Sequence, residues 1–412
     1  MGSKKLRIAV WDHSVSGQRR RRTHGRSPRV LTTAPTSRRL GIALLVIMLS
    51  IVAASAQPDQ ALAARRMLVG MYDPVQPIIS PDKTFATLAN LRVQILRMDL
   101  SWGGYVAKKK PKIAVDPGDP AYNWDIYDEF VLNAHKNKMA VIFTIYGTPA
   151  WANGGQKVNR APTRMLYLKQ FAYAAAKRYS GTFKRSDGVV LPAVRKWMAW
   201  NEPNNPVFLR PQWTRVGKRN IPTAAKNYAA MCTAVWSGVH ATHLKETVAC
   251  GATDPKGNNK ARSSRPSIAP LTFLAALKRY GLRHFDVYAH HPYYASPTES
   301  PAAPPKSKTT VTLGNIDVLI KLLTQLYGNK PLWITEYGYQ TRPPDPHFGV
   351  SWTKQAQYLT QAYAIARKNP RIGMMLWFLL RDESRLAGWQ SGLMTVSGKH
   401  KPAYNAFRRL PH

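Results

Sequence analysis

The stretch VRKWMAWNEP, residues 194–203, places Glu202 directly behind a mostly apolar run that has the length of one buried β-strand. A second stretch, PLWITEYG at residues 331–338, repeats the arrangement and places Glu336 at the end of its apolar run. A single carboxylate at a strand end is ordinary surface chemistry. Two of them converge only if both strands belong to one parallel sheet, so the remaining strands decide whether these glutamates form a pair.

Six further apolar runs have the same character. The eight predicted strands are residues 67–71, 93–98, 140–145, 194–200, 247–250, 285–289, 332–335 and 373–378. Helical spacing marks residues 124–138, 162–179, 222–242, 268–280, 314–327 and 352–368 between them, with weaker patterns at 81–90 and 402–409. Alternating strands and helices predict a parallel sheet covered by helices, and eight units fit a closed (β/α)8 TIM barrel. An open doubly wound sheet is the alternative, but no Gly-x-Gly-x-x-Gly follows the first strand.

Residues 1–56 have the plan of a targeting segment. Residues 1–39 hold eleven Lys or Arg against one Asp, residues 40–53 are almost wholly apolar, and Ala54-Ser55-Ala56 offers an A-x-A cleavage site. This pattern predicts a secreted, extracellular protein. If the segment is not cleaved, residues 40–56 would instead anchor the chain to a membrane. We therefore expect one domain, residues 57–412, behind a basic leader and signal peptide or N-terminal anchor.

The composition indicates a globular and strongly basic chain. It has 412 residues, 44% of them hydrophobic, and a formal net charge of +39. Such a charge predicts electrostatic attraction to anionic polymers. The basic residues are dispersed and accompany no nucleic-acid-binding motif, so we expect no specific nucleic acid partner, and we expect a monomer. The 12 tryptophans and 19 tyrosines slightly favour a carbohydrate site, because aromatic rings stack on the apolar faces of sugars.

Two cysteines, Cys232 and Cys250, leave two alternatives open. Export would permit a disulfide between them, and two buried thiols fit the sequence equally well. Two cysteines without clustered partners make no zinc framework, and the HEXXH and P-loop patterns are absent. We therefore expect no metal and no organic cofactor.

The second predicted strand adds a third charged position. Its end, LRMDLSW at residues 96–102, places Arg97 and Asp99 on the same face because side chains alternate along a strand. An arginine that points into a barrel needs an anionic partner. A catalytic carboxylate would satisfy Arg97 and would be held ionised by it, whereas a purely structural Arg97–Asp99 pair is the alternative.

These positions together resemble the clan A glycoside hydrolases over about residues 67–410, and are most similar to the family five cellulases and the family thirty-nine β-xylosidases. The motif Trp200-Asn201-Glu202-Pro203 is similar to the clan's strand-four signature, and the resemblance implies Glu202 as acid/base and Asn201 as a ligand of the sugar 2-hydroxyl. Glu336 resembles the nucleophile at the end of strand seven.

The same resemblance extends to accessory positions. Arg97 resembles the arginine that orients the nucleophile. The substrate-binding residues implied in addition are His291 and Tyr293 of a strand-six His-x-Tyr element, Trp377 as a sugar platform on strand eight, and Trp151 in the Tyr-Gly-Thr-Pro-Ala-Trp phrase after strand three. Adjacent His290 and Tyr294 leave the register of the strand-six element open by one residue.

The resemblance implies a retaining β-glycoside hydrolase that cleaves a β-linked poly- or oligosaccharide by double displacement, with endo action slightly favoured. Glu202 would protonate the leaving oxygen with a raised pKa, and Glu336 would attack the anomeric carbon. Two alternatives remain open. One is a catalytically silent barrel that binds carbohydrate or cell wall, and the other is a transglycosylase, which passes the same intermediate to a sugar instead of water.

Overall fold

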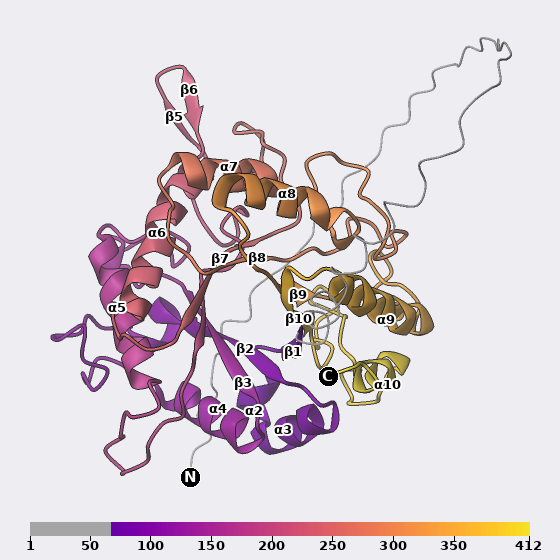
Figure 1. The fold of residues 1–412 in the computed structure, drawn as a ribbon, viewed down its shortest axis with the longest axis horizontal. Helices are drawn as coiled ribbons and strands as arrows, with labels where there is room; N and C mark the ends of the chain where they lie inside the picture. Colours follow the sequence, from indigo (N-terminus) through magenta and orange to yellow (C-terminus); the bar gives the residue numbers. More distant parts are fainter. Residues whose placement is uncertain (1–66) are drawn as a thin grey trace, which may run out of the picture.

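The computed structural model describes residues 67–412, whose centre is a closed barrel of eight parallel strands (Figure 1). The strands are β1 (Leu68–Tyr72), β2 (Ile95–Ser101), β3 (Ala140–Tyr146), β4 (Lys196–Ala199), β7 (Thr247–Thr253), β8 (Val287–His290), β9 (Leu332–Tyr337) and β10 (Ile372–Phe378). Each strand pairs with the barrel strands before and after it in the chain, and β1 pairs with β10 to close the ring. All eight predicted strands and the (β/α)8 fold class are confirmed.

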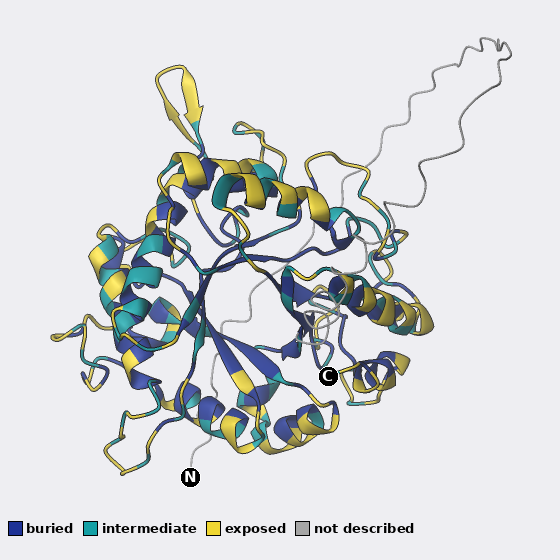
Figure 2. Cartoon of the chain, viewed as in Figure 1, coloured by how far each residue is buried: buried dark blue, intermediate teal, exposed yellow. Residues whose placement is uncertain are grey.

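Within residues 67–412, eight helices of seven or more residues surround the barrel, one after each barrel strand (Figure 1). They are α3 (Pro81–Asn90), α4 (Asp125–Lys136), α5 (Met165–Arg178), α6 (Thr223–His240), α7 (Pro270–Arg279), α8 (Ile316–Tyr327), α9 (Trp352–Lys368) and α10 (Pro402–Arg408). Every helix falls in a segment that the sequence pattern predicts. Figure 2 shows the reason for the pattern, because the barrel strands are largely buried whereas the helices carry exposed residues on their outer faces.

The sequence pattern missed the short elements in the connections. These are α2 (Gln76–Ile79), the irregular turns η1 (Trp102–Val106), η2 (Ala150–Ala152) and η3 (Leu313–Asn315), and the hairpin of β5 (Thr214–Val216) and β6 (Arg219–Ile221). The hairpin projects from the barrel in Figure 1, and five of its six strand residues are exposed. A strand pair without a buried face carries no hydrophobic alternation, so the pattern gives no signal there.

Two layers of apolar side chains fill the fold. The inner layer lies inside the barrel and consists of Ile95, Ile142, Met198, Ala249, Ala252, Val287, Ala289, Trp333, Met374 and Leu376. The outer layer packs between strands and helices. The barrel wall is close-packed at Gly70, where an added Cβ would lie 2.2 Å from the Leu376 side chain and 2.5 Å from the Ile95 carbonyl oxygen. Only glycine fits there.

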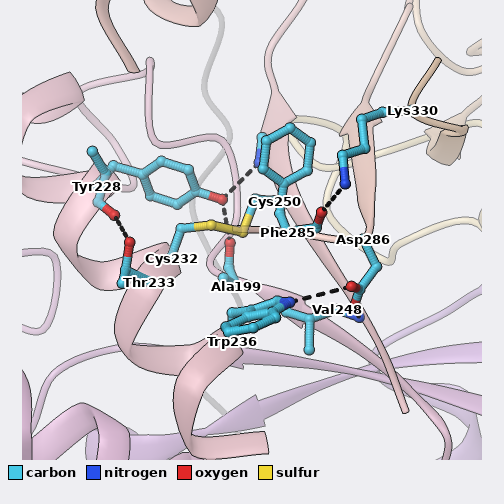
Figure 3. The surroundings of a disulfide bond; sticks show 12 residues. Ala199, Tyr228, Cys232, Thr233, Trp236, Val248, Cys250, Phe285, Asp286 and Lys330 are labelled. Atoms are coloured by element: carbon cyan, nitrogen blue, oxygen red, sulfur yellow. Dashed lines mark hydrogen bonds between the residues drawn. A yellow bond between two sulfur atoms is a disulfide. The ribbon is translucent and has the colours of Figure 1, made fainter. Parts of the chain in front are cut away.

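A disulfide joins Cys232 of α6 to Cys250 of β7, with their Cα atoms 6.0 Å apart (Figure 3). Of the two alternatives that the sequence left open, the structure therefore has the disulfide. Next to it, the Tyr228 hydroxyl donates to the Ala199 carbonyl and accepts from the Gly251 N–H, so α6 is fixed to both β4 and β7.

The predicted leader, residues 1–56, and its apolar run at residues 40–56 lie outside the described residues. Within residues 67–412, no helix is both long enough and apolar enough to cross a membrane.

We expect the disulfide to stabilise the fold measurably. It closes a loop of 18 residues, and removing such a crosslink raises the entropy of the unfolded chain by an amount worth about 3 kcal/mol. The double variant Cys232→Ala/Cys250→Ala should lower the free energy of unfolding by that order in urea titrations. Reductant should destabilise the wild type and leave the variant unchanged. Equal sensitivity of both proteins to reductant would contradict the prediction.

Candidate active site

Glu202 and Glu336 lie at the carboxyl ends of β4 and β9, at the mouth of the barrel. Glu202 follows the last residue of β4 by three positions and has a φ of 36°, which is unusual for a residue with a side chain. Its N–H donates to the Ala252 carbonyl oxygen at 2.9 Å, which helps to hold this conformation. Both glutamates are buried, and one carboxylate oxygen of each lies within 4.8 Å of the other.

Glu336 has a partner on each carboxylate oxygen. Arg97 Nη1 donates to Oε1 at 2.6 Å, and the Tyr293 hydroxyl donates to Oε2 at 3.1 Å. These contacts fix the carboxylate plane, since β2 engages one oxygen and the segment after β8 engages the other.

Arg97 is fully buried and connects three strands of the barrel, β2, β3 and β9, with the loop after β4. Besides Glu336, it donates to Asp99 Oδ1 at 3.1 Å, to Asn201 Oδ1 at 2.7 Å and to Thr144 Oγ1 at 2.9 Å. The pairing with Asp99 and the pairing with a cleft carboxylate, which the sequence offered as alternatives, therefore occur together. Because the Asn201 oxygen accepts from Arg97, its amide N–H groups are directed elsewhere, and they have no hydrogen-bond partner among residues 67–412.

His291 connects the two glutamates, and its surroundings define its tautomer. Its Nε2 lies 3.5 Å from Arg97 Nη1, which can only donate, so Nε2 must carry the lone pair and can also accept from the Thr335 hydroxyl at 3.0 Å. Nδ1 then carries the proton and donates to Glu202 Oε1 at 3.0 Å. Burial, followed by the charge of Arg97, lowers the pKa of His291 well below its usual value, so the ring is neutral.

The strand-six register is now defined. His290 bonds Thr253 and the Val311 carbonyl behind the site, and the Tyr294 hydroxyl donates to the Phe348 carbonyl. His291 and Tyr293 are therefore the pair that faces the carboxylates.

Burial and neighbouring charges set the protonation of the two glutamates. Burial raises the pKa of Glu202 well above its usual value, and the negative charges of Asp254 and Glu336 raise it further. Burial also raises the pKa of Glu336, to about 7, although Arg97 opposes the shift. Arg97 thus keeps Glu336 the more acidic of the two but does not hold it fully ionised at neutral pH. Of the two, Glu202 is the carboxyl group that keeps its proton more readily at neutral pH.

Asp254 is a charged residue of the site that the sequence pattern missed. It follows β7 directly, and Asn205 Nδ2 bridges it to Glu202, at 2.7 Å from Asp254 Oδ2 and 3.4 Å from Glu202 Oε2. The predicted strand ended at Cys250, whereas β7 continues to Thr253. The bulky β-branched Thr253 before an Asp-Pro pair was the signal that could have extended the strand and exposed Asp254 as a strand-end carboxylate.

The carboxylates open into a cleft of about 480 Å³. Its lining residues are Glu202, Asn205, Pro206, Val207, Asp254, Pro255, Lys256, Asn258, Ser264, Arg265, Ser267, Tyr293, Tyr294, Glu336, Gln340, Phe348 and Trp389. Trp389 belongs to the loop between β10 and α10. A buried pair anchors this loop, because Lys401 Nζ contacts Asp382 at 2.7 Å and also donates to the Gln390 carbonyl at 3.2 Å.

Two predicted substrate-binding tryptophans do not lie in this cleft. Trp377 is fully buried in the outer layer, where its indole N–H donates to the Ser391 carbonyl, because alternation along β10 turns Phe378 and Leu376 inward instead. Trp151 packs edge-on against Trp102, and its indole N–H donates to the Ala107 carbonyl. Neither Trp377 nor Trp151 therefore lines this cleft, and a role in substrate binding stays a prediction for both.

Trp389 supplies the aromatic face of the cleft in their place. Its ring centroid lies 5.1 Å from that of Tyr293 and 5.2 Å from that of Phe378. It lies in a loop without hydrophobic periodicity, so no sequence pattern marked it.

Glu202, His291 and Glu336 are also the residues that could hold a metal ion, since their ligand atoms lie within 4.8 Å of one another. The contacts favour an acid–base site over a metal centre. The nitrogen of His291 that faces the glutamates carries a proton, and the Arg97 guanidinium already neutralises Glu336.

The model of a family of unknown function (DUF5722) matches residues 160–411, the part of the chain that carries both glutamates. No curated protein matches the chain.

Solved structures with a similar fold include glycoside hydrolases. A family 39 glycoside hydrolase from the gut symbiont Bacteroides cellulosilyticus WH2 is 19% identical, with a TM-score of 0.58 over 84% of this chain and 64% of that chain. A glucosidase from Croceicoccus marinus is 14% identical, with a TM-score of 0.57 over 84% and 67%. A GH5_18 protein from Streptomyces cattleya, solved in complex with GlcNAc, is 18% identical, with a TM-score of 0.53 over 84% and 79%.

The chain spans less than two thirds of the family 39 enzyme. At these identities the likeness shows the fold alone, and it confirms the closed (β/α)8 barrel.

We expect Arg97→Gln to destabilise the fold in a pH-dependent way. Loss of one partner of a buried ion pair costs about 3–5 kcal/mol. Without Arg97, the pKa of Glu336 rises further above its unfolded value, so the folded state binds the extra proton and stability falls as pH rises. Urea titrations should therefore show a larger loss at about pH 8 than at about pH 5.5. The exposed control Arg215→Gln should lose little at either pH, and an equal loss at both for Arg97→Gln would contradict the argument.

Proposed function

The chain belongs to the family of unknown function DUF5722, so its chemistry has to be inferred from its site, and we propose that it is a retaining β-glycoside hydrolase. The observation that carries the proposal is the separation of Glu202 and Glu336, whose nearest ligand oxygens lie within 4.8 Å. Retaining glycosidases hold their carboxyl groups about 5–5.5 Å apart, whereas inverting enzymes need about 6.5–9.5 Å to admit a water molecule.

In the first step, a carboxylate oxygen of Glu336 attacks the anomeric carbon and the bond to the glycosidic oxygen breaks. Glu202 gives its proton to that oxygen, so the leaving sugar departs as a neutral alcohol. Because its pKa is raised, Glu202 carries the proton that it donates. The contacts of Arg97 and Tyr293 hold Glu336 in position.

In the second step, Glu202 is a carboxylate and takes a proton from water while the water oxygen attacks the anomeric carbon and releases Glu336. The N–H of His291 Nδ1 stabilises the negative charge that Glu202 carries at this stage. The amide N–H groups of Asn201 have no partner within residues 67–412, so they are available to a sugar hydroxyl.

The protonation pattern favours this enzyme over a catalytically silent carbohydrate-binding barrel. Burial of two carboxyl groups at one site raises the pKa of both and costs folding free energy. Such strongly shifted carboxyl groups are typical of catalytic sites, which need a group that can donate a proton. We propose that the substrate is a β-linked poly- or oligosaccharide and that a monomer cleaves it. We also propose that the protein is exported. The Cys232–Cys250 disulfide supports an oxidising compartment, and the basic leader supports export.

Replacement of the nucleophile tests the proposal directly. Glu336→Gln should reduce turnover of a β-glycoside by several orders of magnitude, because an amide cannot form the glycosyl-enzyme. The exposed control Glu129→Gln should retain full turnover. Mass spectrometry of wild-type protein treated with a 2-fluoro glycoside should find the adduct on Glu336. Labelling of another residue, or substantial activity of the variant, would remove the assignment.

The pKa shifts predict a bell-shaped pH profile. Activity should fall as pH decreases below about 7, where Glu336 becomes protonated, and should fall again as pH rises through the pKa of Glu202. Asp254→Asn removes a negative charge that raises the pKa of Glu202, so the basic limb should move to lower pH. Asp187→Asn, in the exposed segment between α5 and β4, is the control and should move neither limb. An unmoved basic limb in Asp254→Asn would exclude Asp254 from this role.

A further inference from the structure

One wall of the cleft is unusually basic. The segment between β7 and α7, residues 254–267, carries Lys256, Lys260, Arg262 and Arg265 against the single acidic residue Asp254. Two of these cations, Lys256 and Arg265, line the cleft itself together with Glu202 and Asp254. The excess of positive charge is therefore present at the mouth of the site as well as on the general surface.

The basic wall has a defined shape because its backbone is bonded internally. The Asn258 side chain donates to the Ser263 hydroxyl at 3.1 Å and to the Arg265 carbonyl at 3.0 Å, and it accepts from the Lys260 N–H at 2.9 Å. Gly257 lies so close to the start of α7 that an added Cβ would be 2.2 Å from the Ala269 nitrogen. Lys256 and Arg265 thus project from a wall that is held in place.

Neither cation of the cleft forms an ion pair within the protein. Lys256 and Arg265 are exposed, and within residues 67–412 no carboxylate oxygen lies within 4.0 Å of the side-chain nitrogens of either residue. Lys256 Nζ approaches only the Ala295 carbonyl, at 3.5 Å. Arg97, the third cation at the barrel mouth, contrasts with them because its donors are taken by Glu336, Asp99, Asn201 and Thr144.

The position of this wall indicates which part of a substrate it would meet. Asn205 connects Asp254 to Glu202, and the charges of Lys256 and Arg265 act on Asp254, so the wall lies on the Glu202 side of the cleft. A proton donor has to lie beside the oxygen that leaves. Groups next to Glu202 therefore border the leaving part of the substrate.

We propose that the cleft binds a sugar chain that carries anionic groups and that Lys256 and Arg265 bind those groups beside Glu202. An ammonium and a guanidinium that are exposed to the cleft and free of ion pairs form charge-assisted hydrogen bonds with a carboxylate or sulfate. A neutral sugar chain would leave both cations without an anionic partner. This proposal rests on the proposed hydrolase function and names the class of its substrate.

Matched oligosaccharides test the charge preference. The full-length variant Glu336→Gln, which should bind without turnover, is titrated calorimetrically with β-1,4-glucuronan and cello-oligomers of equal length. A parallel pair is β-1,4-mannuronan and β-1,4-mannan oligomers. Each pair differs only in a carboxylate in place of a hydroxymethyl group. We expect at least one uronate oligomer to bind about tenfold or more tightly than its neutral partner, and the advantage to shrink as salt rises. A sulfated cello-oligomer, run alongside, separates carboxylate from sulfate recognition.

Two variants locate the effect. Adding Lys256→Gln and Arg265→Gln should remove most of the advantage of the anionic oligomer. Adding Lys278→Gln and Arg279→Gln removes one lysine and one arginine at the far end of α7 and should preserve it. The proposal fails if no anionic oligomer binds better than its neutral partner, or if both double variants weaken binding equally. It also fails if single-stranded DNA binds as tightly and shows the same loss. Hydrolysis of neutral glycosides by the wild type would uphold the proposed function even then.

Discussion

The buried contact between Arg97 and Glu336 is the interaction on which the rest of the site depends. A guanidinium removed from water needs a hydrogen-bond acceptor for nearly every N–H. The attraction in a single ion pair is too weak to offset the free energy of desolvation. Arg97 meets this demand with acceptors on β2, β3 and β9 and in the loop after β4. The same contacts that satisfy the arginine therefore fix Asn201 and Glu336 relative to each other, so the need to satisfy one buried cation organises the barrel mouth.

The difference between the two glutamates comes from their neighbours. Both are buried, which by itself would raise the pKa of each. Of the two glutamates, Glu336 is the one that contacts Arg97, whereas Glu202 lies near Asp254 and has only the neutral donors His291 and Asn205. This difference in neighbouring charge supports the proposed roles of Glu202 as the acid/base and Glu336 as the nucleophile.

The hydrophobic pattern of the sequence was enough to predict the barrel strands and the residues at their ends. The eight strands were found because each is a continuous apolar run, and Glu202, Glu336, Arg97, Asn201, His291 and Tyr293 come together because all lie at strand ends or in the strand. Trp377 was misplaced because alternation along β10 turns it outward. Asp254 was missed because β7 extends beyond the apolar run that marks it in the sequence. Trp389 was missed because the position of its loop depends on long-range contacts such as that of Lys401 with Asp382.

The structure also separates two kinds of positive charge that composition cannot distinguish. A net charge of +39 creates a long-range field that attracts any polyanion, so by itself it selects none. Selection requires cations at a defined place with unused hydrogen-bonding capacity. Arg97 lies at the barrel mouth, but other residues of the protein already accept its hydrogen bonds. A lysine elsewhere on the surface has free N–H donors but does not line the cleft. Lys256 and Arg265 meet both conditions, because they line the cleft beside Glu202 and no carboxylate oxygen of the described chain lies within 4.0 Å of their side-chain nitrogens.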